Sequence, residues 1–556
     1  MYLEHIEISG FRGINHLAIT LQQTTALIGE NAWGKTSLLR ALWCLLGQGV
    51  VPYQFEAADF YQPDSNDRES TAVTHLQPPH LQPQHLQIVL TFCEYRPDMC
   101  QHSERLSRLS SVWCRYKDGF HRIRYRAAAE LSSSAQVVSE HIFWDAQGHR
   151  LELDDPQKMI HLLMLMNPVL RLRDARSTRY GGDDFNVQWE AQLAQVSQHL
   201  LDEDHDKLDE PTVLAGMTAV HSLMAHYLSH VPPIRAKPRN AREIVSKPSS
   251  LRGLGSLQEL MRSANSHSVE LAMAGLGSAL LAARGDREIE IGARPILILE
   301  DPESRLHPTM LALAWGLLEQ VPGQKILTTN SGDLLTSIPL GQIRRLVRHG
   351  HETQAFSLRD EQLSAEELRR ITFHVRINRP MSLFARCWLL VEGETEIWLL
   401  SELASICGYS LRGEGVRVIE FAQCGVVPLI KAARDLGIEW HLLADGDQAG
   451  SKYASSVRSQ LKGDHERDRL TLLPAKDIEH FLYHHGFEAV YRQEAGVTPH
   501  QMLPPTKIIE RAVSRRSKPG LALAVVEAAE RGGIDQMPHT LRQMFSRVIA
   551  LARRQG

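Results

Sequence analysis

The apolar positions near the N-terminus first alternate with polar ones and then change to a longer period. Alternation over residues 2–21, followed by the apolar run Ala26-Leu27-Ile28, predicts a hairpin and then a buried strand. From Thr36 the apolar residues follow one face of a helix, at Leu38, Leu39, Leu42, Leu45 and Leu46. We therefore expect a strand, a glycine loop and a helix in direct succession.

The middle of the chain contains three further patterns. Residues 62–87 are polar and repeat His-Leu-Gln-Pro at His75 and His80, which predicts a mobile loop rather than a metal site. Strands are expected at 86–94 and 111–126. Between about 186 and 230, apolar residues recur at three- and four-residue steps, which predicts a helical hairpin or a dimerising arm. His221 lies on this stripe, and we expect it to pack rather than to bind a ligand.

The C-terminal half predicts two sets of strands. Strands at 295–299 and 325–329 enclose a long apolar helix, and the basic segment 376–381, which contains Pro380, is expected to be a linker. Beyond it, strands at 386–392, 417–422 and 440–444 alternate with helical stretches, which is typical of a parallel βα sheet. The fold class predicted is α/β.

Composition excludes several classes of protein. A chain of 556 residues is expected to form three or four compact units, and 43% hydrophobic residues with no long apolar run argue against a membrane span. The start of the chain has no secretory signal, and the seven cysteines form no C-x-x-C pair, so we expect a cytoplasmic protein with reduced thiols. A net charge of -4 neither supports nor excludes DNA binding.

A phosphate-binding loop joins the predicted strand to the predicted helix. Residues 29–36, GENAWGKT, match G-x-x-x-x-G-K-[ST] at every fixed position. In such a loop the backbone N–H groups surround the phosphates, Lys35 reaches the β and γ oxygens and the Thr36 hydroxyl holds Mg²⁺. The candidate ATP-binding residues are Gly29, Asn31, Gly34, Lys35, Thr36 and Ser37.

A second element of an ATP site is the stretch ILILEDPE, in which an apolar strand ends in Glu300 and Asp301. With the hairpin motif Phe11-Arg12-Gly13-Ile14, it resembles the ABC-type ATPase heads of the structural-maintenance and OLD (overcoming lysogenisation defect) families. The resemblance implies that Glu300 coordinates Mg²⁺ and that Asp301 polarises the attacking water. It also implies a signature loop, contributed to the opposite protomer, at Gly275, Gly277 and Ser278.

Asn330 stands where such heads carry a switch histidine after a strand. An asparagine can hydrogen-bond a γ-phosphate but cannot take up a proton at neutral pH. We therefore expect slow hydrolysis of ATP.

Acidic residues follow two of the C-terminal strands. Glu392-Gly393 ends one strand, and Asp445-Gly446-Asp447 ends another. Because ligands gather at the carboxyl ends of parallel strands, and because a helical turn brings Glu396 back over Glu392, we expect these four carboxylates to meet. Unpaired carboxylates repel one another unless a cation lies among them, and hard oxygen ligands suit Mg²⁺ or Mn²⁺.

The pattern Glu392-Gly-x-x-Glu396 followed by Asp445-x-Asp447 resembles the Toprim fold of primases, topoisomerases and OLD nucleases. A phosphate-loop head followed by a Toprim domain resembles the OLD family, in its YbjD-like branch. That resemblance implies a two-metal site in which Glu392 is a ligand or a base, Glu479 is a further acid with Asp477 as its neighbour, and Lys518 stabilises the pentavalent phosphate. The alternative for Glu479 and Asp477 is a charge at a helix N-terminus, and the alternative for Lys518 is a solvated basic run beside Arg515 and Arg516.

The expected domains are an ATPase head at 1–175 and 236–378, a helical insertion at 176–235 and a Toprim domain at 382–545. The hypothesis is a homodimeric, ATP- and Mg²⁺-dependent DNA endonuclease, with a helicase encoded elsewhere as an open question. Two groups of basic residues could contact a DNA backbone: Arg171, Arg173 and Arg176, and Arg511, Arg515, Arg516 and Lys518. The alternatives are an ATP-switched DNA clamp that does not cut and, without a cysteine ribbon to support it, a primase-like nucleotidyl transferase.

Overall fold

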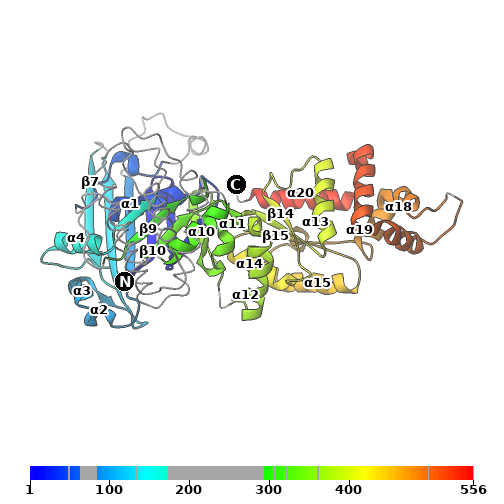
Figure 1. Ribbon diagram of the computed structural model, residues 1–556. Helices are drawn as coiled ribbons and strands as arrows, with labels where there is room; N and C mark the ends of the chain where they lie inside the picture. Colours follow the sequence, from blue (N-terminus) through cyan, green and yellow to red (C-terminus); the bar gives the residue numbers. More distant parts are fainter. Residues whose placement is uncertain are drawn as a thin grey trace, which may run out of the picture. The chain divides into compact units, whose positions relative to one another are not determined.

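The structure is a computed structural model that describes residues 1–47, 51–62, 84–132, 136–172, 293–304, 308–320, 323–359, 362–498 and 500–554. The chain forms two compact units. Unit 1 comprises Met1–Ile338 and Gln342–Ala355, and unit 2 comprises Pro339–Gly341 and Phe356–Gly556. Figure 1 colours the elements of both units in sequence order, from blue at the N-terminus to red at the C-terminus.

An antiparallel sheet forms one layer of unit 1. Its strands are β1 (Tyr2–Phe11), β2 (Ile14–Thr20), β4 (Gln84–Cys93), β5 (Cys114–Arg115), β6 (His121–Leu131) and β7 (Val137–Trp144). Their order is β2-β1-β4-β6-β5, with β7 paired to β6. In β1 the alternate residues Ile6 and Ile8 are fully buried, as the period of two predicts. The short helices α2 (Met99–His102) and α3 (Glu104–Ser107) follow β4, and α4 (Pro156–Met166) follows β7.

A second sheet of unit 1 carries the phosphate loop. It consists of β3 (Thr24–Ile28), β8 (Val169–Leu172), β9 (Ile296–Glu300), β10 (Gln324–Thr328), β11 (Ile343–His349) and β12 (Glu352–Phe356), in the order β12-β11-β3-β10-β9-β8. The pairs from β11 to β8 are parallel. Along the chain α1 (Lys35–Leu46) follows β3, α10 (Pro308–Gln320) lies between β9 and β10, and α11 (Gly332–Ser337) lies between β10 and β11.

Unit 2 is built around a four-stranded parallel sheet. The strands β13 (Cys387–Val391), β14 (Val416–Glu420), β15 (Glu439–Ala444) and β16 (Leu470–Leu472) lie in the order β14-β13-β15-β16. The remaining elements are mostly helical: α12 (Ala365–Ile371), η8 (Thr372–Ile377), η9 (Pro380–Phe384), α13 (Glu394–Ile406), α14 (Val426–Asp435), α15 (Gln448–Ser459), α16 (Glu466–Arg469), α17 (Ile478–Leu482), α18 (Glu488–Glu494), α19 (Pro505–Gly532) and α20 (His539–Arg553). In Figure 1 α19 and α18 lie side by side at one end of the unit, where they pack together.

The predicted α/β class and the parallel C-terminal sheet are confirmed. Three details differ from the expectation. β4 begins at Gln84, inside the segment expected to be a loop, β16 was not predicted, and the expected linker at 376–381 folds as the helical turns η8 and η9 within unit 2. The rest of the His-Leu-Gln-Pro segment and the predicted helical insertion lie outside the described residues.

Candidate active site

Two of the predicted acids lie at the same edge of the unit 2 sheet. β13 and β15 are adjacent and parallel, with Leu390 opposite Leu442. Glu392 directly follows β13 and Asp445 directly follows β15. Both strands are buried except at the first residue of β15, so the acids end two apolar segments at one edge of the sheet. The sequence-based placement of these two side chains is therefore observed.

The other two acids of the motif lie in the first turns of the helices that follow. Glu396 belongs to the first turn of α13, and its Oε2 accepts a hydrogen bond of 3.0 Å from the Gly393 N–H. Asp447 is the N-cap of α15, and its Oδ1 accepts a bond of 2.7 Å from the Gly450 N–H. Each carboxylate therefore has one oxygen engaged with the backbone.

Close backbone approaches at Gly446 and Gly450 hold this edge together. A Cβ at Gly450 would lie 1.8 Å from the Asp445 carbonyl oxygen. A Cβ at Gly446 would lie 2.5 Å from the carbonyl oxygens of both Leu473 and Ala475, in the segment after β16. Glycine at these positions brings α15 and the segment leading to α17 against the end of β15.

Further ionisable residues near this edge come from α17 and from α19. Asp477 is the N-cap of α17, and its Oδ1 accepts 2.7 Å bonds from the N–H and the Nδ1 of His480. Glu479 is buried and forms an ion pair of 2.9 Å with the Nζ of Lys518. Lys518 follows Ser517, where φ is 63° and α19 is interrupted. The left-handed conformation of Ser517 thus interrupts α19 directly before Lys518.

The electrostatics indicate that these residues share one environment. Burial, followed by the charges of Glu392, Glu396, Asp477 and Glu479, raises the pKa of Asp445 to about 8.

Two of the other acids respond in the same direction. Burial and then Asp447 raise the pKa of Glu392, against the opposing effect of Lys518. Burial also raises the pKa of Glu396, with Glu479 adding to it. Burial works against the charge of Lys518, but its bond to Glu479 and the nearby acids raise its pKa. Burial and the neighbouring acids therefore disfavour the charged forms of these carboxyl groups when no cation is bound.

The acids approach one another less closely than a single shared ion would require. Among the described residues, no three of these carboxylates have ligand atoms that all lie within 4.8 Å of one another. The expectation that four carboxylates meet at one point is thus not met by the side chains as they stand. Glu396 and Asp447 each turn one oxygen toward a backbone N–H. The chemistry of the donor set still suits Mg²⁺ or Mn²⁺, which bind carboxylate oxygens.

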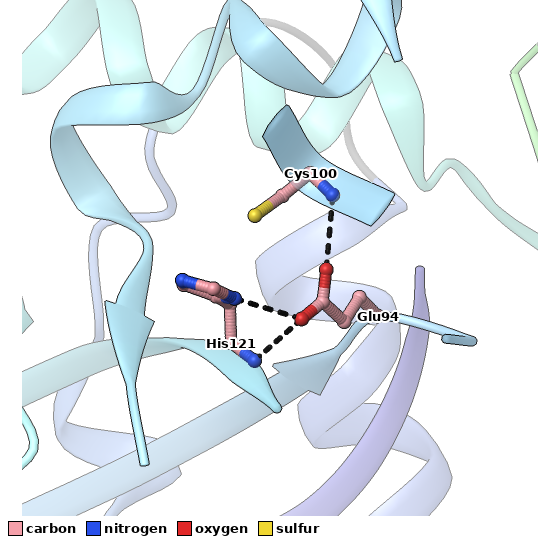
Figure 2. Close-up of side chains that lie close together, drawn as sticks. All are labelled: Glu94, Cys100 and His121. Atoms are coloured by element: carbon pink, nitrogen blue, oxygen red, sulfur yellow. Dashed lines mark hydrogen bonds and ion pairs between the residues drawn. The ribbon is translucent and has the colours of Figure 1, made fainter. Parts of the chain in front are cut away.

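One compact group of metal-type ligands does occur in the described part of the chain, in unit 1: Glu94, Cys100 and His121. Figure 2 shows that the contacts drawn all end on the Glu94 carboxylate and none on the sulfur. Oε1 of Glu94 accepts bonds from the N–H of Asp98 and from both the N–H and the Nδ1 of His121, and Oε2 accepts one from the Cys100 N–H.

This group has the geometry of a hydrogen-bonded cluster. The 2.8 Å between His121 Nδ1 and Glu94 Oε1 is shorter than the roughly 3.3 Å that separates two ligands of one tetrahedral ion. Burial, with Glu94 beside it, raises the pKa of the Cys100 thiol to about 12, so the sulfur is protonated. We interpret the buried Glu94 as a structural residue that ties the α2 segment to the start of β6.

The phosphate loop has the predicted local structure. It runs from the end of β3 to α1, and Gly29 and Gly34 have φ values of 143° and 91°. A Cβ at Gly34 would lie 2.8 Å from the side chain of Ile14, so the hairpin motif packs against the loop. Ser37 Oγ accepts a 3.3 Å bond from the Gly13 N–H in the same hairpin, whereas Asn31 and Thr36 are exposed.

Lys35 is buried and folds back onto its own loop. Its Nζ donates to the carbonyl oxygens of Gly29 and Glu30. Burial lowers the pKa of Lys35, and the negative charges of Asp301 and Glu303 oppose that shift. The acids that follow β9 therefore act on the charge of the Lys35 ammonium, and its role in binding ATP stays a prediction.

The acids after β9 include one that the sequence analysis did not select. Glu300 ends β9 and pairs in register with Thr328, and Asp301 Oδ1 accepts a 3.0 Å bond from the Thr328 hydroxyl. Glu303 Oε1 accepts a 2.6 Å bond from the N–H of Asn330, and burial raises the pKa of Glu303. Glu303 is the last letter of E-D-P-E, so the signal was present in the motif.

Six of the residues selected from the sequence have no described position. Gly275, Gly277, Ser278, Arg173, Arg176 and His221 lie outside the described residues. Of the C-terminal basic group, Arg515 donates to the Ala495 carbonyl and Arg516 pairs with Glu494. Both guanidinium groups therefore have local structural partners, whereas Lys518 pairs with the predicted site acid Glu479.

Comparison with known proteins places the chain in a family. The family described as a protein of unknown function (DUF2813) matches residues 1–382, and the family described as the overcoming lysogenization defect protein-like TOPRIM domain matches residues 383–447. The chain belongs to the DUF2813 family. It is 43% identical over 564 residues to the Escherichia coli K12 protein called uncharacterized protein YbjD, covering 100% of this chain and 99% of that protein.

Two of the solved structures that are similar to this DUF2813 protein match different parts of the chain. The C-terminal region of the Burkholderia pseudomallei OLD protein is 17% identical, covers 30% of this chain and 99% of that one, and has a TM-score of 0.25. The SMC head domain from Thermotoga maritima is 12% identical, covers 65% of this chain and 100% of that one, and has a TM-score of 0.29. In the described part of the chain, none of the helices has the length and apolar character needed to cross a membrane.

Proposed function

We propose that this DUF2813 protein is a DNA endonuclease that depends on a divalent metal and is regulated by ATP. The observation that supports it most directly is the acidic edge itself. Glu392, Glu396, Asp445 and Asp447 lie at or just beyond the carboxyl ends of β13 and β15, within the residues that match the OLD-like TOPRIM domain. Carboxylates at this position are suited to phosphodiester hydrolysis with two metal ions.

Each residue has a role in this proposal. Glu392, Glu396, Asp445, Asp447 and Glu479 would hold Mg²⁺ or Mn²⁺, which when bound would act as Lewis acids on the phosphate. Glu392 would accept the proton of the attacking water, because its pKa is raised by burial and by Asp447. Lys518, kept protonated beside Glu479, would stabilise the charge that develops on the phosphate.

The ATP site of the proposal lies in unit 1. Lys35 would exchange its contacts with the loop carbonyls for the β- and γ-phosphates, and Thr36 and Glu300 would hold Mg²⁺. Asp301 would polarise the attacking water, and Asn330 would contact the γ-phosphate without taking up a proton. A homodimer completes the site through the predicted signature loop at Gly275, Gly277 and Ser278, and DNA is the proposed partner.

A plasmid-nicking assay with Mn²⁺ tests the proposal. We expect the wild-type protein to nick supercoiled DNA, and Glu392→Ala or Asp445→Ala to abolish nicking while ATP turnover remains. Lys35→Ala should remove ATP turnover and leave nicking without ATP unchanged. The matched control is Asp468→Asn, an acid that precedes β16 at the opposite edge and pairs with Arg554.

The alternative is an ATP-switched clamp that binds DNA without cutting it. A clamp would retard the plasmid in a gel and leave it intact under every metal condition. Nicking at the wild-type rate by both acid variants would refute the proposed catalytic edge.

A further inference from the structure

The acidic edge has a second flank, on the β14 side. Glu420 is the last residue of β14 and lies opposite Val391 in register, so it is next to the turn that carries Glu392. Asp445 lies beyond the other side of β13. Glu420 is 3% exposed, and such a buried carboxylate is expected to have a partner. Its strand was predicted, but the residue was not selected as part of the site.

The partner of Glu420 is Arg379, which is oriented by a buried histidine. His374 Nε2 lies 2.7 Å from the Glu420 carbonyl oxygen, so this nitrogen donates and Nδ1 is left to accept. The Nη1 of Arg379 lies 3.3 Å from that Nδ1. Burial lowers the pKa of His374, which is consistent with a neutral ring. Arg379 is thereby fixed at the end of β14.

Arg379 is only loosely paired with the acids around it. Its Nη2 is 3.6 Å from Glu420 and 3.8 Å from Glu394, and both distances are longer than a hydrogen bond. The Arg379 side chain is 23% exposed, and that of Glu394 is 77% exposed, so Glu394 can move away without cost in burial. A partly exposed guanidinium beside a proposed nuclease site suits a phosphate, which it can bind through two parallel hydrogen bonds.

An exposed aromatic residue lies on the same helix as Glu394. Trp398 is one turn further along α13, on the face that Glu394 occupies, and it is 38% exposed. Aromatic rings beside a cationic path are the usual contacts of single-stranded DNA, because every base has a face that can stack. Trp398 therefore lies one helical turn from Glu394, whose carboxylate is 3.8 Å from Arg379.

We propose that Arg379 and Trp398 form a binding site for single-stranded DNA next to the acidic edge. Arg379 binds a phosphate neighbouring the one that is cut, and Trp398 stacks on an unpaired base. The inference rests on the proposed nuclease function and deepens it, because it assigns the substrate a single-stranded segment at the cut. Arg379 is then a substrate-binding residue and His374 a positioning residue.

The test measures binding separately from cutting. Fluorescence anisotropy of a labelled single-stranded oligonucleotide, in Ca²⁺ and at 50–200 mM salt, gives the Kd and its salt dependence for the full-length protein. We expect Arg379→Gln to raise the Kd about fivefold and to reduce the slope of log K against log salt by about 0.7, the value for one phosphate contact to a single strand. Arg379→Lys should restore the slope.

Trp398→Ala should raise the Kd about tenfold for single-stranded DNA, leave the salt slope unchanged and affect a blunt duplex much less. Trp398→Phe should retain most of the affinity. The matched control is Arg458→Gln, in the last turn of α15, which is paired with Glu466 and lies at the end of that helix opposite the acidic edge. This control should leave both quantities unchanged.

A purely structural role for Arg379 makes a different prediction. If Arg379→Gln lowers the unfolding temperature but leaves the salt slope at the wild-type value, the proposed phosphate contact is refuted. Equal losses of single-stranded and duplex binding in Trp398→Ala would refute the stacking contact. If the variants weaken binding as expected while the wild-type protein cuts no DNA in Mn²⁺, the nuclease function fails and the single-stranded DNA site stands.

Discussion

Replacing Asp445 by asparagine should stabilise the metal-free protein at alkaline pH. In the folded state the pKa of Asp445 is raised from its ordinary 3.8 to about 8 by burial and by the neighbouring acids. Below about pH 4 the carboxyl is protonated in both states. As the pH rises toward 8, the unfolded chain releases this proton and the folded chain retains it, so the wild-type protein loses stability over that window.

The size of the effect follows from the shift. Each pH unit within the window costs up to about 1.4 kcal/mol. Because Asp445 is only partly buried, solvent screening reduces the sum, and we expect about 2 kcal/mol at pH 8. For a unit of this size that corresponds to a rise of about 4–8 °C in the unfolding temperature of Asp445→Asn.

Scanning calorimetry in EDTA at pH 5 and pH 8 measures the effect, and tryptophan fluorescence assists because Trp388 and Trp440 are buried in this sheet. The gain should shrink at pH 5. Added Mn²⁺ should raise the unfolding temperature of the wild-type protein and not that of Asp445→Asn. The control Asp468→Asn should give no gain. A loss of stability in Asp445→Asn at pH 8, or no response of the wild-type protein to Mn²⁺, would refute the reasoning.

Three more predictions concern the backbone of the edge, its lysine and the buried cluster of unit 1. Gly450→Ala should lower the free energy of unfolding by about 1–3 kcal/mol and the nicking rate at least tenfold, because the new Cβ clashes with the Asp445 carbonyl. In the control Gly341→Ala the new Cβ has no neighbour within 4 Å, so this variant should behave as wild type in both assays. Lys518→Met should lower the nicking rate about 100-fold with little change in DNA affinity, and an unchanged rate would remove the lysine from the mechanism. Glu94→Gln should lower the free energy of unfolding by about 2–4 kcal/mol, because four hydrogen bonds converge on this buried carboxylate. Stoichiometric Zn²⁺ in the purified wild-type protein, absent from Cys100→Ser, would contradict this structural role.

Local patterns were sufficient where a function depends on one short segment. The glycine loop, its strand and its helix could be predicted because apolar periodicity and glycine spacing are both local properties. For the same reason the positions of Glu392 and Asp445 at strand ends were correct, since an apolar run ending in an acid fixes the residue at the edge of a sheet.

What the sequence by itself determined was thus the α/β class, the phosphate loop and which acids end which strands. Tertiary structure alone decided how those acids are engaged. Two carboxylates accept bonds from backbone N–H groups at helix N-termini, the four do not meet at one point, and Lys518 reaches Glu479 across 39 residues of chain. It also decided the β14 flank, where His374, Arg379 and Glu420 meet. Such contacts depend on strand order and on helix packing, which bring together residues that no local repeat relates.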